Sequence, residues 1–235
     1  DRYHVRMLEM HESIKIIRLP TYLRDQSNFS IILNYLSFII FSVIYSIKFI
    51  FNSNFDKILV FGTSPPSGLL AAHIIRIFKK IPVYYWILDL WPETLNSVGF
   101  SKRNLIFIIL EKFMNYSYSK CKFIFCQSKS IQSLISKKIR NKKKAIYFPS
   151  WSENLPLHKN QKLNKLINKR DFNIMFTGNI GQSQDFESVV NAAKILEEYR
   201  NIKWIIVGEG RFLYKLKLLI KKKNLEKKFI FIGCQ

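Results

Sequence analysis

Short apolar runs alternate with longer segments of helical character along most of this 235-residue chain. The runs are rich in β-branched and aromatic residues, as strands are. Parallel strands must be joined by a crossover of about a dozen residues or more, most often a helix. Strands that alternate with helices of roughly 10 to 15 residues predict βαβ units and parallel sheets. The chain is therefore expected to have an α/β fold.

The expected elements form two groups, separated by a polar, basic stretch without clear periodicity. The first group has strands at 57–61, 83–88, 122–126 and 145–148, with helices at 69–80, at 102–119 and from Ser128 onward. The second has strands at 173–177, 203–207 and 229–232, with helices at 186–199 and 212–223. We expect a Rossmann-like domain over 1–150, a linker over 151–171 and the start of a second Rossmann-like domain over 172–235, each a doubly wound parallel sheet.

Both ends of the sequence suggest an internal fragment. Position 1 is Asp rather than Met, and the chain stops just past the last expected strand. A buried parallel strand needs a covering helix, which would still have to follow. Both domains are therefore expected to be incomplete.

The chain carries 38 Lys and Arg residues against 16 Asp and Glu, a formal charge of +22. An apolar fraction of 48% excludes a disordered class. The charge fits nucleic acid, an anionic membrane or an anionic substrate as partner, although abundant Lys, Asn and Ile also fit compositional drift of a genome. Part of the charge is clustered, at 137–138, 142–144 and 221–223. The three cysteines, Cys121, Cys126 and Cys234, show no paired spacing, which favours a reducing cytoplasm over a disulfide framework or zinc site.

Residues 30–51 form an almost unbroken apolar stretch, interrupted by Asn34 and Lys48. Its length reaches the roughly 20 residues that a membrane-spanning helix needs. Three interpretations stay open: a transmembrane helix, a buried helix of the domain, or a helix that packs on the domain and dips into the membrane interface. Tyr35, Tyr45 and several Phe residues favour the interfacial helix, because aromatic rings settle at the water–lipid boundary.

Ligands of doubly wound sheets bind beyond the carboxyl ends of the strands. In the first group, the strand 83–88 leads directly into Asp89, Trp91 and Glu93. These carboxylates suit a general base toward an acceptor hydroxyl or a site for sugar hydroxyls, and Trp91 suits stacking on a sugar ring. The alternative is that Asp89 caps a turn and Trp91 fills space beneath it.

In the second group, glycine turns follow two successive strands: Gly178 to Gly181, and Gly208 to Gly210 with Arg211 next. Glycine lets backbone amides approach a phosphate, and a following helix adds positive potential. Two such turns after successive strands favour a phosphate site over tight turns alone. Arg211 suits pairing with a diphosphate, although an arginine solvated at a helix start is the alternative.

No other catalytic signature is apparent. The four histidines show no metal-ligand spacing, and there is no Walker loop, no dinucleotide fingerprint and no Asp-x-Asp motif of metal-dependent sugar transferases. The sequence therefore predicts neither a metal nor a cofactor.

Together these segments resemble the GT4 family of retaining glycosyltransferases, which have the two-domain GT-B fold. The resemblance covers most of the chain and is strongest to the subgroup that makes O-antigen, capsule and colanic-acid sugars, including N-acetyl-L-fucosamine transferases. It depends on these strings, in this order: Ser64-Pro65-Pro66, the run from Pro82 to Glu93, Phe148 to Glu153, Phe176 to Gly181 with Gln184, and Val207 to Arg211.

The resemblance implies roles for individual residues. Asp89 would face the acceptor, and the turn with Ser64, Pro65 and Pro66 would line the acceptor cleft. The donor diphosphate would lie against Gly178, Asn179 and Gln184, with the nucleotide near Gly208 and Arg211. Many relatives have Arg and Lys where this chain has Asn179 and Gln184, which leaves neutralisation of the diphosphate to Arg211 or to residues outside the sequence.

The implied activity is transfer of a sugar from a UDP-sugar to a lipid-linked saccharide, at the cytoplasmic face of the inner membrane. Residues 30–51 and the Lys clusters would bind the anionic membrane as a peripheral protein, and no nucleic acid is expected. The glycine-rich first turn and the paired glutamates of the family are missing, so the fragment itself is expected to be inactive. Two alternatives remain, a basic nucleic-acid-binding module and the remnant of an inactive transferase.

Overall fold

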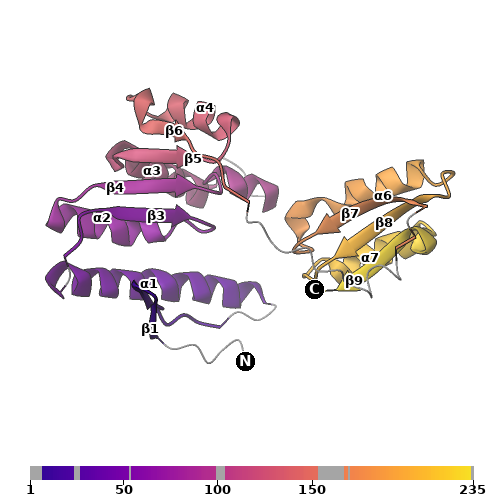
Figure 1. The fold of residues 1–235 in the computed structure, drawn as a ribbon, viewed down its shortest axis with the longest axis horizontal. Coiled ribbons are helices and arrows are strands. Elements are labelled where there is room, and N and C mark those ends of the chain that lie inside the picture. The colour runs from indigo at the N-terminus through magenta and orange to yellow at the C-terminus, as the bar shows by residue number, and fades with distance from the viewer. Residues whose placement is uncertain are drawn as a thin grey trace. The chain divides into compact units, whose positions relative to one another are not determined.

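The chain divides into two compact units, Asp1–Ser152 and Glu153–Gln235 (Figure 1). The structure is a computed structural model that describes residues 7–23, 27–52, 54–98, 104–152, 167–168 and 170–233. Most of the linker expected over 151–171 lies outside these residues.

The first unit is built on a parallel sheet of four strands, as expected. Its strands are β3 (Ile58–Gly62), β4 (Val83–Ile87), β5 (Phe123–Cys126) and β6 (Ala145–Tyr147), and they lie side by side in sequence order. Every neighbouring pair is parallel. The alternation of apolar strands and helices thus predicted both the strands and their direction.

Three helices connect these strands: α2 (Gly68–Lys79), α3 (Leu105–Lys120) and α4 (Lys129–Lys138). Two of them begin at residues that cap free amides. The Asn104 side chain accepts a hydrogen bond from the Ile106 amide, and Ser128 accepts one from Ile131. Such N-caps are typically worth about 1 kcal/mol. Two short 3₁₀ turns, η1 (Glu93–Val98) and η2 (Lys142–Lys144), complete the connections.

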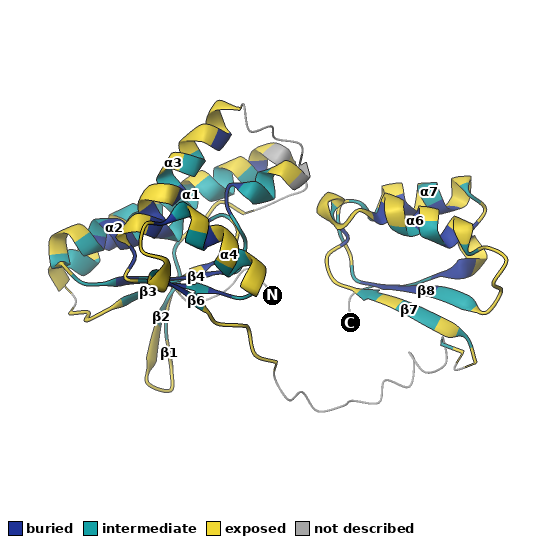
Figure 2. Ribbon diagram, turned by 90° about the horizontal axis from the view of Figure 1, so that it is seen from above, coloured by how far each residue is buried: buried dark blue, intermediate teal, exposed yellow. Residues whose placement is uncertain are grey.

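The core of the first unit lies between the sheet and these helices. Val83, Tyr85 and Ile87 alternate on one face of β4 and belong to a buried cluster that includes residues of α2, α3 and α4. Right-handed crossovers between strands in sequence order put all helices on the same face, and Figure 2 shows this layer. In the described part of the chain, the opposite face carries no helix and is aromatic, with Phe61, Trp86 and Phe125 among its residues.

The apolar stretch folds as one helix, α1 (Asn28–Asn52), which packs beside α2 (Figure 1). Its buried side is small and polar, because Ser42 and Ser46 are 6% and 1% exposed. Their hydroxyls donate to the carbonyls of Ile39 and Val43 within the helix. The opposite side is an exposed apolar stripe, defined as Ile32, Leu36, Ile40, Ile44, Ile47 and Phe51.

In the described residues one side of α1 is exposed, which favours the transmembrane and interfacial interpretations of residues 30–51 over a buried helix. Among the described helices, α1 alone is long and apolar enough to cross a membrane, judged by length and composition, and 17% of its most apolar window is buried. Small residues toward a neighbouring helix and apolar residues outward are typical of helices in contact with lipid. The transmembrane and interfacial interpretations both stay open.

An antiparallel hairpin, which the sequence pattern did not predict, precedes α1. Its strands are β1 (Leu8–His11) and β2 (Ile14–Ile17). Glu12 occupies the turn with φ of 52°, and Arg18 forms an ion pair with Glu9 at 2.6 Å. Four-residue strands give too short a pattern to recognise against the helical signal beside them.

The second unit repeats the same layer arrangement on a smaller scale. Its parallel sheet has the order β7 (Phe172–Thr177), β8 (Ile202–Val207) and β9 (Phe229–Gly233). Two helices, α6 (Phe186–Ile195) and α7 (Leu213–Lys222), enclose a core with these strands, and η3 (Gln182–Gln184) and η4 (Glu226–Lys228) are short turns. Helix α6 ends four residues before the expected Tyr199, because the chain turns after Ile195.

Candidate functional site

At the carboxyl edge of the first sheet, Gly62 allows a close approach of β3 and β4 that the sequence did not predict. A Cβ atom at Gly62 would lie 2.5 Å from a ring carbon of Tyr85 and 2.6 Å from the Trp86 carbonyl oxygen. The Gly62 carbonyl accepts the amides of Leu88 and Asp89, each at 3.3 Å. The turn after β3 and the chain after β4 are thereby fixed side by side.

This arrangement brings Ser64 and Asp89 together. The Ser64 hydroxyl donates to Asp89 Oδ2 at 2.5 Å and accepts the indole N–H of Trp91 at 3.1 Å. Among the described residues no donor reaches Asp89 Oδ1, and the carboxyl group is partly exposed. The structure thus presents one carboxylate oxygen, oriented through the other, at the edge where ligands of parallel sheets bind.

Trp91 packs in the core of the unit and does not present its ring for stacking on a sugar. It is 9% exposed and lies in the core of the unit, where the Tyr118 hydroxyl donates to its carbonyl oxygen at 3.3 Å. An indole at this burial offers no face to a sugar ring. The acceptor-binding role expected for Trp91 is corrected: its N–H orients Ser64, and its ring fills the space beneath the turn.

The prolines of the turn shape its backbone. Pro65 follows a cis peptide bond from Ser64, and the carbonyl of the buried Pro66 accepts the Leu69 amide at 3.1 Å at the start of α2. This last bond joins the turn to the start of α2, and contact with an acceptor stays a prediction for both prolines.

Glu93 is engaged in an ion pair with Lys138 of α4. The side chains of the pair are 32% and 20% exposed, and Glu93 Oε2 is buried without a hydrogen-bond partner. A carboxylate neutralised in this way is a weaker candidate for a general base than Asp89. The sequence held no signal for this pair, because its members are 45 residues apart on separate elements.

In the second unit, the two glycine turns pack directly against one another. A Cβ at Gly208 would lie 2.0 Å from the Gly178 carbonyl oxygen, and one at Gly210 would lie 2.3 Å from that of Ile180. Gly178 and Gly208 also have φ of +148° and +131°, which residues with side chains rarely adopt. Glycine is therefore required here for the fit of the loops.

Backbone bonds at this edge decide which amides a ligand can use. The amides of Gly178, Ile180, Gly181 and Gly208 already donate to carbonyl oxygens of the loops and strands. Within the described ranges, those of Asn179, Glu209 and Gly210 donate to no such oxygen. Three amide donors thus remain available where β7 and β8 end, a concentration of positive potential typical of phosphate sites.

Three polar side chains surround this edge. Asn179, Gln184 and Arg211 are all exposed, Gln184 in η3 and Arg211 just before α7. All three side chains are therefore accessible to a ligand that binds at the turns. Their contact with a donor nucleotide is a prediction that follows from the resemblance.

No metal site is evident in the ranges that the structure covers, where no three His, Cys, Asp or Glu side chains gather. Cys121 and Cys126 are buried and unpaired. Burial raises the pKa of the Cys121 thiol to about 12 and that of Cys126 to about 11. Both thiols are therefore protonated at neutral pH and unsuited to nucleophilic or metal chemistry.

The fold of the described chain is α/β with parallel sheets, and the solved structures that resemble it include glycosyltransferases of the GT-B fold. Residues 158–235 match the family described as glycosyl transferases group 1. This segment contains both glycine turns of the second unit.

A curated relative is the probable glycosyltransferase WbjE of Pseudomonas aeruginosa, 20% identical over 182 residues, which are 74% of this chain and 45% of the relative. WaaG, a glycosyltransferase involved in lipopolysaccharide biosynthesis, has a TM-score of 0.65 at 10% identity and covers 97% of this chain with 59% of its own. HepE of Anabaena, solved with UDP and glucose, has a TM-score of 0.61 at 13% identity, covering 83% and 51%. The chain thus spans about half the length of these relatives.

Proposed function

We propose that the whole protein is a glycosyltransferase that moves a sugar from a nucleotide donor, UDP-linked, to a lipid-linked saccharide in the synthesis of a surface polysaccharide, with retention of anomeric configuration. The observation that carries the proposal is the second unit. Its glycine turns lie in the segment that matches group 1 glycosyltransferases, and they leave three amides available at the carboxyl edge of the sheet. Amides fixed in this way stabilise a departing diphosphate without reorganisation.

The choice of UDP is supported by a structural relative. HepE was solved with UDP and glucose, and this chain has the same fold over most of its length. Neutralisation of the diphosphate falls to Arg211, the one cation next to the three available amides in the described turns. The sugar and its linkage, including the N-acetyl-L-fucosamine subgroup, stay predictions from the resemblance.

The acceptor side is assigned to the first unit. Asp89 is oriented by Ser64 through Oδ2 and is partly exposed, and no donor reaches Oδ1 among the described residues. A carboxylate in this position can accept the proton of an incoming hydroxyl or hold a sugar hydroxyl. Positioning of this kind is a large part of what an enzyme contributes to group transfer.

A membrane-bound acceptor is supported by helix α1. Its exposed apolar stripe lies opposite to the side that packs on α2, on a chain of formal charge +22. Lys and Arg near an anionic membrane add roughly 1 kcal/mol of attraction each. We therefore propose that the protein works as a peripheral protein at the cytoplasmic membrane face, with no metal required.

The test is an assay of the full-length protein with a panel of UDP-sugars, each with membrane lipid extract from the source organism as acceptor. Release of UDP with one sugar, dependent on the extract and unaffected by a chelator, is the expected result. If no UDP-sugar turns over while another nucleotide-sugar does, the donor assignment is wrong. If RNA binds the protein and no nucleotide-sugar reacts, the nucleic-acid alternative replaces the proposal.

A further inference from the structure

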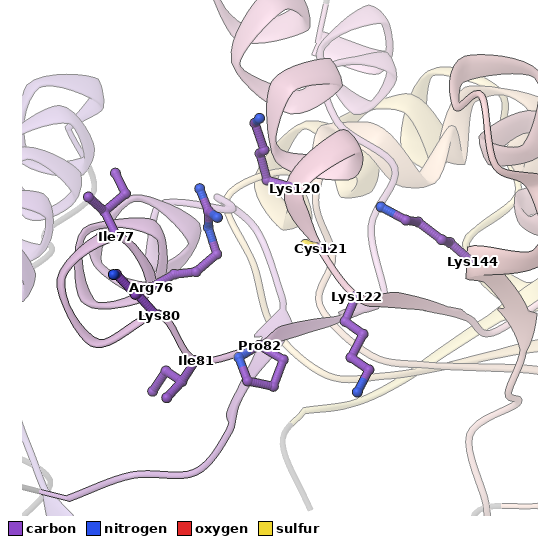
Figure 3. A pocket seen from close by; sticks show the side chains of 9 residues that line it. All are labelled: Arg76, Ile77, Lys80, Ile81, Pro82, Lys120, Cys121, Lys122 and Lys144. Carbon is purple, nitrogen blue, oxygen red and sulfur yellow. The ribbon is translucent and has the colours of Figure 1, made fainter.

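A basic cavity lies at the edge of the first sheet opposite to Asp89. It has a volume of about 770 Å³ and is formed where α2 and α3 end and where β4, β5 and β6 begin. Figure 3 shows the side chains that line it. They are Arg76, Ile77, Lys80, Ile81, Pro82, Lys120, Cys121, Lys122 and Lys144.

The charged side chains that line the cavity are all positive. Five cations line the cavity and no carboxylate does. Within the parts of the chain that the structure describes, none of the five takes part in an ion pair. The carbonyls at the ends of α2 and α3 offset only part of this charge, because each helix end carries about −0.5 of an elementary charge. Five positive charges against about one negative charge leave a strong local excess.

The lining residues also have hydrogen-bond donors that are not fully used. Arg76 Nε is buried and has no hydrogen-bond partner, an arrangement that costs free energy unless a ligand or water completes it. Lys144 donates one hydrogen bond, to the Ser119 carbonyl at 2.9 Å, and keeps further donor capacity. In Figure 3 the guanidinium of Arg76 and the ammonium of Lys144 approach the cavity from opposite sides.

We propose that this cavity binds an anion that carries phosphate groups. Arginine recognises phosphate oxygens through its planar fork of donors, and lysine supplies compact charge beside it. The cavity exceeds the space that one phosphate group fills, so a diphosphate or a phosphorylated headgroup suits it. The anion comes either from a small soluble polyphosphate or from a phospholipid headgroup. The site is separate from the glycine turns, which belong to the second unit.

Titration of the chain with inorganic pyrophosphate at low salt, followed by calorimetry, tests the first source. Lys144→Gln and Lys122→Gln should each weaken binding by about three- to tenfold, and Arg76→Gln by more than tenfold, since each removes a charge-assisted contact. Lys143→Gln is the matched control, because it removes the same charge from an exposed neighbour outside the cavity. Its affinity should stay within about twofold of wild type.

Vesicles that contain phosphatidic acid test the second source, with phosphatidylcholine vesicles as the neutral reference. If the headgroup is the ligand, Lys144→Gln lowers binding to phosphatidic acid vesicles several-fold more than Lys143→Gln does. Because both variants keep α1 intact, the contribution of the apolar stripe cancels in this comparison. Circular dichroism confirms that Arg76→Gln is folded, and the two lysine variants serve if it is not. Equal losses for Lys144→Gln and Lys143→Gln in both assays, or no binding in either, overturn the proposal.

Discussion

At the scale of single residues, the site of the first unit depends on one hydroxyl. Ser64 donates to Asp89 and accepts from Trp91, so it fixes the direction of the carboxylate. The residue types were predictable from the sequence, because Asp89 and Ser64 each follow a strand. Their contact was not, because it requires the parallel pairing of β3 and β4 and the close approach at Gly62.

Replacement of Asp89 tests its assigned role. In the full-length protein, Asp89→Asn should lower kcat by about 10²- to 10⁴-fold, the usual contribution of a positioned acid or base. Ser64→Ala should lower it by about tenfold, since it removes one hydrogen bond to a charged group. UDP release is the measurement, and Glu12→Gln, which changes an exposed carboxylate on the hairpin, is the control. An unimpaired Asp89→Asn enzyme would remove this residue from the mechanism.

His73 gives the chain a dependence of stability on pH. It is 4% exposed, both ring nitrogens lack partners, and burial with the nearby Arg76 charge lowers its pKa from 6.5 to about 4. Between these values the unfolded chain binds more protons than the folded one. The free energy of unfolding therefore decreases as the pH falls from 6.5 to 4, by up to roughly 3 kcal/mol from this residue.

His73→Leu should remove that contribution, because leucine is apolar, of similar size and does not titrate. At pH 7 the change should be neutral or stabilising, since it buries no unsatisfied polar atom. Urea unfolding at pH 7 and pH 4.5 is the measurement, with the exposed His11→Leu as control. A pH dependence that persists in His73→Leu and vanishes in His11→Leu would contradict the assignment.

At the scale of elements, the strands and helices of both sheets were predictable to within a few residues, because apolar periodicity and capping residues act locally. The hairpin β1–β2 and the orientation of α1 were not. An apolar helix has no polar face from which its direction could be read. The buried side of α1 is recognisable only through Ser42 and Ser46, which its packing on α2 selects.

Gly208 and Gly210 in the turns of the second unit should tolerate no side chain, because a Cβ at either position would overlap backbone atoms. Gly208→Ala places a Cβ 2.0 Å from a carbonyl oxygen at φ of +131°, so it should destabilise the chain by about 3 kcal/mol or more. Gly68→Ala is the matched control. Its Cβ meets only a methyl group at 3.7 Å, and alanine favours the helix that begins there. Thermal unfolding should show a decrease for the first variant and a small increase for the second; equal effects would contradict the geometry.

The apolar stripe of α1 should control membrane association. Burial of one isoleucine is worth about 1.5–3 kcal/mol, so Ile40→Asn with Ile44→Asn should lower vesicle binding by at least about tenfold. Ile195→Asn is the control, because Ile195 is 80% exposed and lies on α6 of the second unit. Co-sedimentation with anionic vesicles is the measurement. Undiminished binding of the double variant would assign the interaction to the lysines alone.

At the scale of the whole molecule, the chain consists of two α/β units, and it spans about half the length of the relatives it resembles. The parallel sheets follow from the alternating pattern of the sequence. The amides that remain available in the second unit do not, because hydrogen bonds of the loops decide which ones they are. Glycine in the sequence predicted the turns, whereas the amides that stay available there belong to Asn179 and Glu209 as well as to Gly210.

The most direct test of the nucleotide site is a ¹H–¹⁵N correlation spectrum of the chain titrated with UDP. Saturable shifts are expected, largest for the amides of Asn179, Glu209 and Gly210. Those of Gly178 and Gly208 should change less, because their amides stay bonded to carbonyl oxygens. Shifts confined to other parts of the chain, or none at millimolar UDP, would contradict it.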